Sequence, residues 1–298
     1  MGRALWKRIA DWSKRAGTRS RRFDDYDVVR LIHEGEKACV YQARSPKDGS
    51  LVAIKAYKPL YNRSARRLCK RYHLRREGEA GLLLNPREGE DAADWPIVRT
   101  LDFGHEFDDP DRCYYVIQEF IDGNNVRHLM GCNDPIVREL RMEIAMTVGR
   151  ALSIIHQRGM IHRDICMDNV LLTRERKAKL IDLGFMAPAG VAFEERTGTP
   201  SYMAPEQFVG QPLQPMTDIY SFGILVFELF TGKQPFTTRY PASNPDVASR
   251  RLSMLREQHI KKPPPKPSEV NPDIPDDLDA VLLTCLEKDP ADRYQRMD

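Results

Sequence analysis

The sequence predicts an α+β fold in which strands come first and helices follow. Residues 26–45 alternate between apolar and polar side chains, which indicates two strands joined by a turn. Further on, five apolar residues repeat at helical spacing: Leu140, Ile144, Val148, Leu152 and Ile155. A second segment, 217–232, is apolar almost all round, as in a buried helix, with Thr217 as its expected cap and Gly232 as its stop. At 298 residues the chain is long enough for two lobes.

Composition excludes several classes of protein. The six cysteines are scattered without a CxxC pair, so neither a disulfide framework nor a zinc site is indicated, and a reduced, cytoplasmic compartment fits. The longest apolar run, 219–230, is interrupted by Ser221, Gly223 and Glu228 and is too short to span a bilayer. We expect no signal peptide, because charged residues interrupt the short apolar stretch at the start.

Basic residues are concentrated in an N-terminal extension that we place at 1–25. The net charge is +3, yet residues 1–22 hold eight Lys or Arg against one Asp, so the rest of the chain is acidic. Four of their neighbours fall at helical spacing: Leu5, Ile9, Trp12 and Ala16. This pattern is typical of a helix that lies peripherally on an anionic membrane or docks on a partner. The alternative is a solvated leader that packs on the folded part or is disordered.

The stretch IHRDICMDN at 161–169 gathers polar groups suited to phosphate chemistry. It places a carboxylate at Asp164 and a side-chain amide at Asn169. A second carboxylate, Asp182, follows two short apolar runs, 170–172 and 178–181, which predict a hairpin that returns Asp182 beside Asn169. Oxygen ligands of this kind suit Mg²⁺, and Asp164 is left free to orient and deprotonate a hydroxyl.

HRDxxxxN followed by the DLG triplet at 182–184 resembles the catalytic and metal-binding segments of the eukaryotic-type (Hanks-type) protein kinases. The other motifs of that family follow in order over nearly everything after Tyr26. GTPSYMAPE at 198–206 is similar to the serine/threonine type, and the short activation loop is similar to that of bacterial members. The resemblance implies a two-lobed protein kinase fold, with a small β-rich N-lobe at 26–117, a hinge at 118–123 and a larger, mainly helical C-lobe at 124–298.

The resemblance also implies a binding site for ATP. Only the middle one of the three glycine positions in the phosphate loop, Gly35, keeps glycine. Lys55 would contact the α- and β-phosphates with Glu77 as its anionic partner, and Glu79 is the alternative partner. The other residues implied to bind the nucleotide are Ile32, Val40, Ala53, Gln118, Glu119, Ile121 and Leu171.

The implied activity is transfer of the γ-phosphoryl group of ATP to a serine or threonine hydroxyl of a protein substrate. Asp164 would position the hydroxyl and accept its proton, and Thr199 would bridge towards Asp164. Asn169 and Asp182 would hold Mg²⁺, with Mn²⁺ as an alternative ion. No nucleic-acid partner is expected, and the oligomeric state is left open. Two structural contacts are implied as well, Asp218 with the backbone of the catalytic loop and Arg293 with Glu206.

Departures from the family pattern leave a second class of function open. Cys166 stands where serine/threonine-type members usually carry a lysine that neutralises the transferring phosphate. Losing one charge-assisted contact costs about 1.5–3 kcal/mol, or roughly a ten- to hundred-fold lower rate. Together with Leu183 in place of phenylalanine and the degenerate glycine loop, this leaves a slow kinase and a pseudokinase scaffold as alternatives. A kinase of small molecules is disfavoured, because GTPSYMAPE forms the peptide platform in protein kinases.

Arg163 of the HRD motif is expected to organise the activation segment. Thr197 carries the only hydroxyl in the loop before Gly198, which makes it the candidate phosphorylation site. We hypothesise that Glu195 pairs with Arg163 and partly replaces a phosphate, with Glu194 as an alternative partner. Two solvated glutamates are the simpler interpretation.

Overall fold

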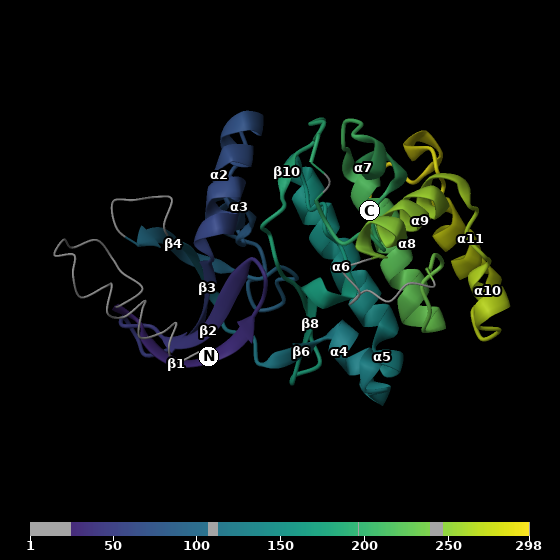
Figure 1. Ribbon diagram of the computed structural model, residues 1–298. Coiled ribbons are helices and arrows are strands. Elements are labelled where there is room, and N and C mark those ends of the chain that lie inside the picture. The colour runs from purple at the N-terminus through teal and green to yellow at the C-terminus, as the bar shows by residue number, and fades with distance from the viewer. Residues whose placement is uncertain (1–24, 107–112, 196, 239–246, 298) are drawn as a thin grey trace. The chain divides into compact units, whose positions relative to one another are not determined.

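The computed structural model describes residues 25–106, 113–195, 197–238 and 247–297. These residues form two compact units, labelled by element in Figure 1. Unit 1 comprises Met1–Asn85 and Arg99–Ile121, and unit 2 comprises Pro86–Val98 and Asp122–Asp298. The helix expected within residues 1–22 lies outside the described part of the chain.

Unit 1 is built on one antiparallel sheet of five strands in the order β1-β2-β3-β5-β4. The strands are β1 (Asp27–Glu34), β2 (Ala38–Arg44), β3 (Leu51–Tyr57), β4 (Thr100–Glu106) and β5 (Cys113–Glu119). Two helices, α2 (Pro59–Tyr72) and α3 (Glu77–Leu84), belong to the same unit. The predicted pair of strands is confirmed, and its turn is closed by a 3.0 Å hydrogen bond from the backbone N–H of Gly35 to the carbonyl of Ala38.

Side chains alternate between the two faces of this sheet, because successive residues of a strand point in opposite directions. One face carries a buried cluster made of Cys39, Tyr41, Ala43, Val52, Ile54, Tyr115 and Ile117. The other face carries Ala38, Tyr57, Tyr114 and Val116. By this alternation Val40, Ala53, Lys55 and Gln118 all lie on the second face, which is also the face on which Tyr114 meets helix α3.

Helix α3 approaches the sheet closely because its second residue is glycine. A Cβ atom on Gly78 would lie 2.4 Å from Cβ of Phe103, which no side chain tolerates. The backbone N–H of Gly78 donates a 2.8 Å hydrogen bond to the hydroxyl of Tyr114 on β5. This contact fixes the first turn of α3, and with it Glu77, against the sheet.

Unit 2 is mainly helical. Its helices are α4 (Val126–Gly131), α5 (Pro135–Glu139), α6 (Arg141–Gln157), α7 (Pro205–Val209), α8 (Pro215–Thr231), α9 (Ala248–Lys261), α10 (Pro267–Val270) and α11 (Asp276–Cys285). Two short 3₁₀ turns, η2 (Met167–Asn169) and η4 (Pro290–Asp292), accompany them. A small sheet has the order β6-β8-β9, with β6 (Gly123–Asn125), β8 (Val170–Thr173) and β9 (Ala178–Leu180), and β7 (Met160–Ile161) pairs with β10 (Ala187–Pro188). The predicted α+β architecture is therefore confirmed.

Helix α8 is buried along most of its length, as its apolar sequence predicts, and it ends at Gly232 in a left-handed conformation with φ of 72°. The prediction of Thr217 as the N-cap residue is wrong, although its side chain takes part in the cap. The cap is Gln214, because Pro215 starts the helix and leaves Thr217 in its first turn. There the hydroxyl of Thr217 accepts a 3.2 Å hydrogen bond from the backbone N–H of Gln214. No helix among the described residues is long and apolar enough to cross a membrane.

The acidic loop at 86–98 belongs to unit 2 although it follows α3 in the sequence. Asp94 pairs with Arg150 of α6 at 2.9 Å and with Lys177 at 3.3 Å. Glu90 pairs with Arg158 just after α6 at 3.0 Å. The loop thus has a structural role that its sequence alone did not indicate, since it neutralises cations along α6 and the β8–β9 turn.

Candidate active site

A buried carboxylate on α8 anchors the backbone of the catalytic loop in unit 2. Asp218 accepts hydrogen bonds of 2.8 Å from the backbone N–H groups of both His162 and Arg163, and it lies 2.9 Å from the ring of His156. Burial alone would raise the pKa of Asp218, but the hydrogen bond and charge of His156 and the contacts with His162 outweigh it and lower the pKa. The expected contact of Asp218 with the loop backbone is confirmed. His156 was not predicted, because only the fold brings α6 beside α8.

This anchoring holds Arg163 in an uncommon backbone conformation. Its φ of 71° lies in the left-handed region, which costs a non-glycine residue about 1–3 kcal/mol. The two hydrogen bonds to Asp218 offset that strain and turn the chain sharply before Asp164. The backbone conformation of the loop is therefore determined by the buried carboxylate of Asp218 rather than by the φ preference of Arg163 itself.

Asp164 lies at the centre of a network of hydrogen bonds. One carboxylate oxygen accepts from both the backbone N–H and the hydroxyl of Thr199, each at 2.8 Å. The side-chain amide of Asn169 donates to the carbonyl of Asp164 at 2.8 Å and to its second carboxylate oxygen at 3.3 Å. Because the amide nitrogen of Asn169 is engaged in this way, its single side-chain oxygen is the end that remains as a metal ligand.

The predicted hairpin is confirmed and brings Asp182 next to Asn169. Strands β8 and β9 pair Val170 with Leu180, and the N–H of Ile181 donates to the carbonyl of Asn169 at 2.8 Å. Asp182 itself has φ of 61°, and its carboxylate accepts a 3.2 Å hydrogen bond from the N–H of Gly184. The backbone conformation and the N–H of Gly184 thus both orient the carboxylate of Asp182.

The donor set at this place fits Mg²⁺. An amide oxygen and a carboxylate are hard ligands, and Mg²⁺ is commonly held by one or two carboxylates together with phosphates of the substrate. In the part of the chain that the structure describes, no three His, Cys, Asp or Glu residues form a closed metal cage. Asn169 and Asp182 would therefore share the ion with a bound nucleotide.

Cys166 is a neutral, buried side chain two residues after Asp164. Its side chain is 1% exposed, and its sulfur lies 3.7 Å from the hydroxyl of Thr199. Burial, followed by the charge of Asp164, raises the pKa of this thiol well above its ordinary value. The side chain is therefore a neutral thiol rather than a thiolate, and a thiol carries no positive charge to replace that of the family's lysine. It fills space beside Asp164.

In unit 1 the distance to Lys55 shows which of two glutamates, Glu77 or Glu79, is its partner. Lys55 Nζ lies 3.1 Å from the carboxylate of Glu77, which is 5% exposed. Glu79 has a different task, because its carboxylate accepts a 3.0 Å hydrogen bond from the N–H of Arg76 and so caps helix α3. Lys55 is thus directed by a buried anion on the neighbouring helix.

The residues implied to contact the adenine are brought together by strand register. Val40 pairs with Lys55 across β2 and β3, and Ala53 pairs with Gln118 across β3 and β5. Gln118 is 8% exposed, and its amide nitrogen has no hydrogen-bond partner among the described residues. A buried amide without a protein partner is typical of a position that meets a ligand or water.

For the other residues implied to contact the nucleotide, the structure shows their positions but no feature that points to a ligand. Ile32 sits at an irregularity in the β1–β2 pairing and is 43% exposed. The carboxylate of Glu119 is engaged with Arg99 at 3.0 Å. Ile121 is the last residue of unit 1, and Leu171 lies on β8 in unit 2. Their contacts with a base, like that of Gly35 with phosphates, stay predictions.

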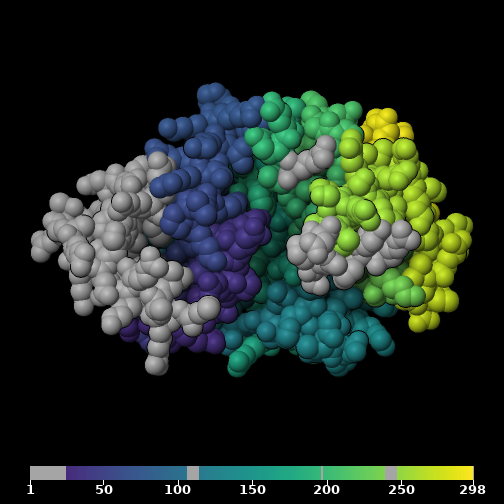
Figure 2. Space-filling model, in the orientation of Figure 1, coloured from purple at the N-terminus to yellow at the C-terminus, as the bar shows by residue number. Residues whose placement is uncertain are grey.

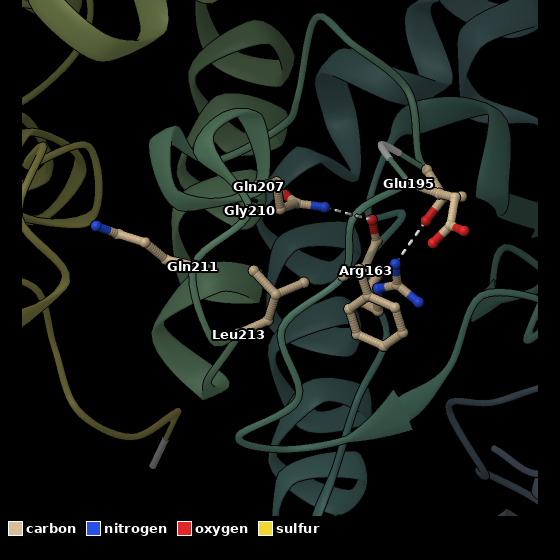
Figure 3. A pocket seen from close by; sticks show the side chains of 8 residues that line it. Arg163, Glu195, Gln207, Gly210, Gln211 and Leu213 are labelled. Carbon is tan, nitrogen blue, oxygen red and sulfur yellow. Dashed lines mark hydrogen bonds between the residues drawn. The ribbon is translucent and has the colours of Figure 1, made fainter. Parts of the chain in front are cut away.

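Arg163 also reaches into the activation segment. Its guanidinium donates to the hydroxyl of Thr197 at 2.6 Å and to the carbonyl of Phe185 at 3.2 Å, and it stacks on the ring of Phe193 at 3.5 Å. Figure 3 shows Arg163 and Glu195 lining one small cavity, with the amide of Gln207 donating to the carbonyl of Arg163 at 3.1 Å. The proposed pairing of Glu195 with Arg163 is consistent with this placement and stays a prediction.

A second arginine, missed from the sequence, links four segments of unit 2. Arg127 of α4 contacts Glu228 of α8 at 2.5 and 3.2 Å and Asp168 of η2 at 3.5 Å. It also donates to the hydroxyl of Tyr202 in GTPSYMAPE. Its partners are up to 101 residues away in sequence, so no spacing pattern could reveal them.

The end of the activation segment is fixed by the expected ion pair. Arg293 donates to both carboxylate oxygens of Glu206, at 2.8 and 2.9 Å, and both side chains are buried. A sequence model of the protein kinase domain matches residues 26–298. The chain belongs to the protein kinase family. The two units therefore correspond to the lobes of a kinase, and the α+β kinase fold expected from the motifs is confirmed.

Similar curated kinases come from bacteria. The chain is 30% identical over 279 residues to the probable serine/threonine-protein kinase SCO3848 of Streptomyces coelicolor, which covers 92% of this chain and 38% of that protein. It is 28% identical over 274 residues to the probable serine/threonine-protein kinase CPE1738 of Clostridium perfringens, covering 91% and 36%. It is 28% identical over 278 residues to the serine/threonine-protein kinase PknB of Mycolicibacterium smegmatis, covering 91% and 41%.

These relatives confirm the assignment to the Hanks-type serine/threonine kinases, including the similarity to bacterial members. The chain spans only about two fifths of the length of these kinases. What the relatives share with it is therefore the kinase domain.

Proposed function

We propose that this kinase domain transfers the γ-phosphoryl group of ATP to serine or threonine hydroxyls of protein substrates. The observation that carries the proposal is the fixed carboxylate of Asp164, held by Thr199 on one oxygen and by Asn169 on the other. A carboxylate in this position accepts a hydrogen bond from an incoming hydroxyl and takes its proton as the phosphoryl group is transferred.

The remaining residues position the nucleotide. Lys55, directed by Glu77, supplies a cation for phosphate oxygens. Asn169 and Asp182 would hold Mg²⁺, which when bound neutralises charge on the phosphates. Mn²⁺, with similar preference for oxygen ligands, is an alternative.

The substrate class follows from the segment that ends at Glu206. Tyr202 is held by Arg127 and Glu228, and Ser221 donates to the carbonyl of Tyr202 at 2.8 Å. These contacts hold GTPSYMAPE in place, with its Thr199 against Asp164, as expected for docking an extended peptide rather than a small molecule.

A pseudokinase scaffold is the second candidate, and the neutral Cys166 is the observation that favours it. The buried thiol removes one cation from the transferring phosphate, so we expect a slow enzyme rather than an inactive one. Replacing Cys166 with lysine should raise turnover about ten-fold or more if the missing charge limits the rate.

The test is phosphoamino-acid analysis after incubation with labelled ATP, Mg²⁺ and a generic basic protein. Label on serine and threonine supports the proposal. Label on tyrosine alone or on a small-molecule acceptor contradicts the substrate class. Absence of label, with Mg-ATP still raising the melting temperature, supports the scaffold.

A further inference from the structure

Helix α2 carries a basic face to which the proposed function assigns no role. From Lys58 to Arg76 the sequence holds eight Lys or Arg and no Asp or Glu. Figure 2 shows this segment, in blue, at the surface. Five of them, Arg63, Arg66, Arg67, Lys70 and Arg71, lie on α2 itself. This density of one charge on a helix of 14 residues creates a local positive field.

One side of α2 attaches the helix to unit 1. Asn62 is fully buried and accepts a hydrogen bond from Arg76 at the start of α3, and Tyr61 stacks on Tyr57 of β3 with ring centres 5.4 Å apart. The opposite side faces solvent, with Leu60, Arg63, Arg67 and Lys70 exposed. At 3.6 residues per turn these four residues share about a quarter of the helix circumference.

Three cations of this face have no partner among the residues that the structure describes. Arg63, Arg67 and Lys70 form no ion pair or side-chain hydrogen bond with any residue that the structure describes. Some exposed cations of unit 2 are paired instead: Arg150, Arg174 and Lys177 contact carboxylates at 2.9, 3.1 and 3.3 Å. The charges of Arg63, Arg67 and Lys70 are therefore available to an external anion.

An apolar side chain accompanies them. Leu60 is 80% exposed, the highest value among the large apolar residues of the described chain. Insertion of a leucine into the boundary between headgroups and acyl chains is favourable, while cations beside it contact anionic headgroups. The phosphate backbone of a nucleic acid offers no such apolar contact.

We propose that the α2 face formed by Leu60, Arg63, Arg67 and Lys70 docks on an anionic membrane surface. A basic residue near such a surface increases affinity roughly five-fold, so three of them contribute roughly a hundred-fold. The interaction weakens as salt screens the charges. The membrane interaction does not depend on phosphoryl transfer, so it can be tested separately from the proposed kinase activity.

The test is co-sedimentation of the full chain with phosphatidylcholine vesicles that contain or lack phosphatidylglycerol. The variant Arg63→Gln/Arg67→Gln/Lys70→Gln is compared with Lys47→Gln/Lys233→Gln/Lys266→Gln, which removes the same charge from exposed positions elsewhere. The basic residues at 1–22 are present in every protein, so their contribution cancels. A third variant, Leu60→Ser, tests the apolar contact, and duplex DNA serves as a second anionic ligand.

We expect the α2 triple variant to lose roughly a hundred-fold in affinity for anionic vesicles, the control triple variant much less, and Leu60→Ser several-fold. Equal losses in the two triple variants would show that net charge alone acts and would overturn the proposal. Tighter binding to DNA than to vesicles, unaffected by Leu60→Ser, would overturn it in favour of a nucleic-acid partner.

Discussion

Thr199 places two donors on one carboxylate oxygen of Asp164, its backbone N–H and its hydroxyl, each at 2.8 Å. The pair joins the activation segment to the catalytic loop, so the orientation of Asp164 depends on the ordered state of the segment that carries Thr199. Removing only the hydroxyl should therefore impair catalysis without unfolding the loop.

We expect Thr199→Val to lower turnover about ten- to a hundred-fold, because one hydrogen bond to a charged group is lost while the backbone bond remains. Thr199→Ser keeps the hydroxyl and should retain most activity. Steady-state kinetics on a peptide substrate measure both variants. Equal turnover in the valine variant and the original protein would contradict a positioning role for this hydroxyl.

The two glutamates of α3 offer a matched comparison. Glu77→Gln removes the buried partner of Lys55, and we expect a large fall in kcat/KM for ATP because the lysine loses its direction. Glu79→Gln affects only the helix cap, so turnover should persist with a loss of stability of about 1 kcal/mol or less. The assignment fails if Glu79→Gln impairs ATP use as much as Glu77→Gln does.

Glu195 and Glu194 allow a test of the activation segment. Glu195 lines the cavity with Arg163, whereas Glu194 is exposed. We expect Glu195→Ala to lower turnover several-fold and Glu194→Ala to leave it nearly unchanged. Unchanged turnover in Glu195→Ala would remove the idea that this carboxylate partly replaces a phosphate. Mass spectrometry of the active protein shows separately whether Thr197 is modified.

Arg293 and Glu206 form a buried ion pair, with side chains 0% and 2% exposed. Arg293→Ala leaves Glu206 charged and buried, which should cost about 3–5 kcal/mol in the free energy of unfolding. Arg296→Ala removes an exposed arginine three residues away and should cost little. Denaturant unfolding compares the two. Similar small losses in both would show that Glu206 finds another partner.

His259 should make stability depend on pH. It is buried against the rings of Phe208 and Phe236, and burial, aided by the charge of Lys288, lowers its pKa to about 3. The unfolded chain takes up a proton near pH 6.5, whereas the folded chain does so only near 3. Stability should therefore fall as pH decreases between these values, by up to about 1.4 kcal/mol per pH unit.

The variant His259→Gln should flatten this part of the pH profile, whereas replacement of the exposed His128 by glutamine should not. Denaturation midpoints measured from pH 7 down to pH 4 provide the comparison. An unchanged slope in His259→Gln would assign the acid sensitivity to other groups.

Much of the fold and of the site was predictable because the informative patterns are local. The period of two at 26–45, the helical repeat before residue 156 and the two apolar runs around 170–181 each determine one element with its neighbour. The hairpin then fixes the relation of Asn169 to Asp182, which is why that part of the site followed from the sequence.

Other features depend on contacts that spacing does not encode. Arg127 contacts Glu228, which is 101 positions away in the sequence. Whether Glu77 or Glu79 is the partner of Lys55 depends on which of them the first turn of α3 directs towards the sheet. Thr217 was wrongly predicted as the N-cap residue because a good capping residue and a proline compete within one turn, and the proline sets the start of the helix.

The measurement that bears most directly on the central claim is incorporation of labelled phosphate from Mg-ATP by the Asp164→Asn variant, with Asp273→Asn as a control. Asp273 is exposed and lies outside the site. We predict that Asp164→Asn loses transfer while Mg-ATP still raises its melting temperature, and that Asp273→Asn transfers as the original protein does. Transfer that persists in Asp164→Asn would show that this carboxylate does not serve the reaction.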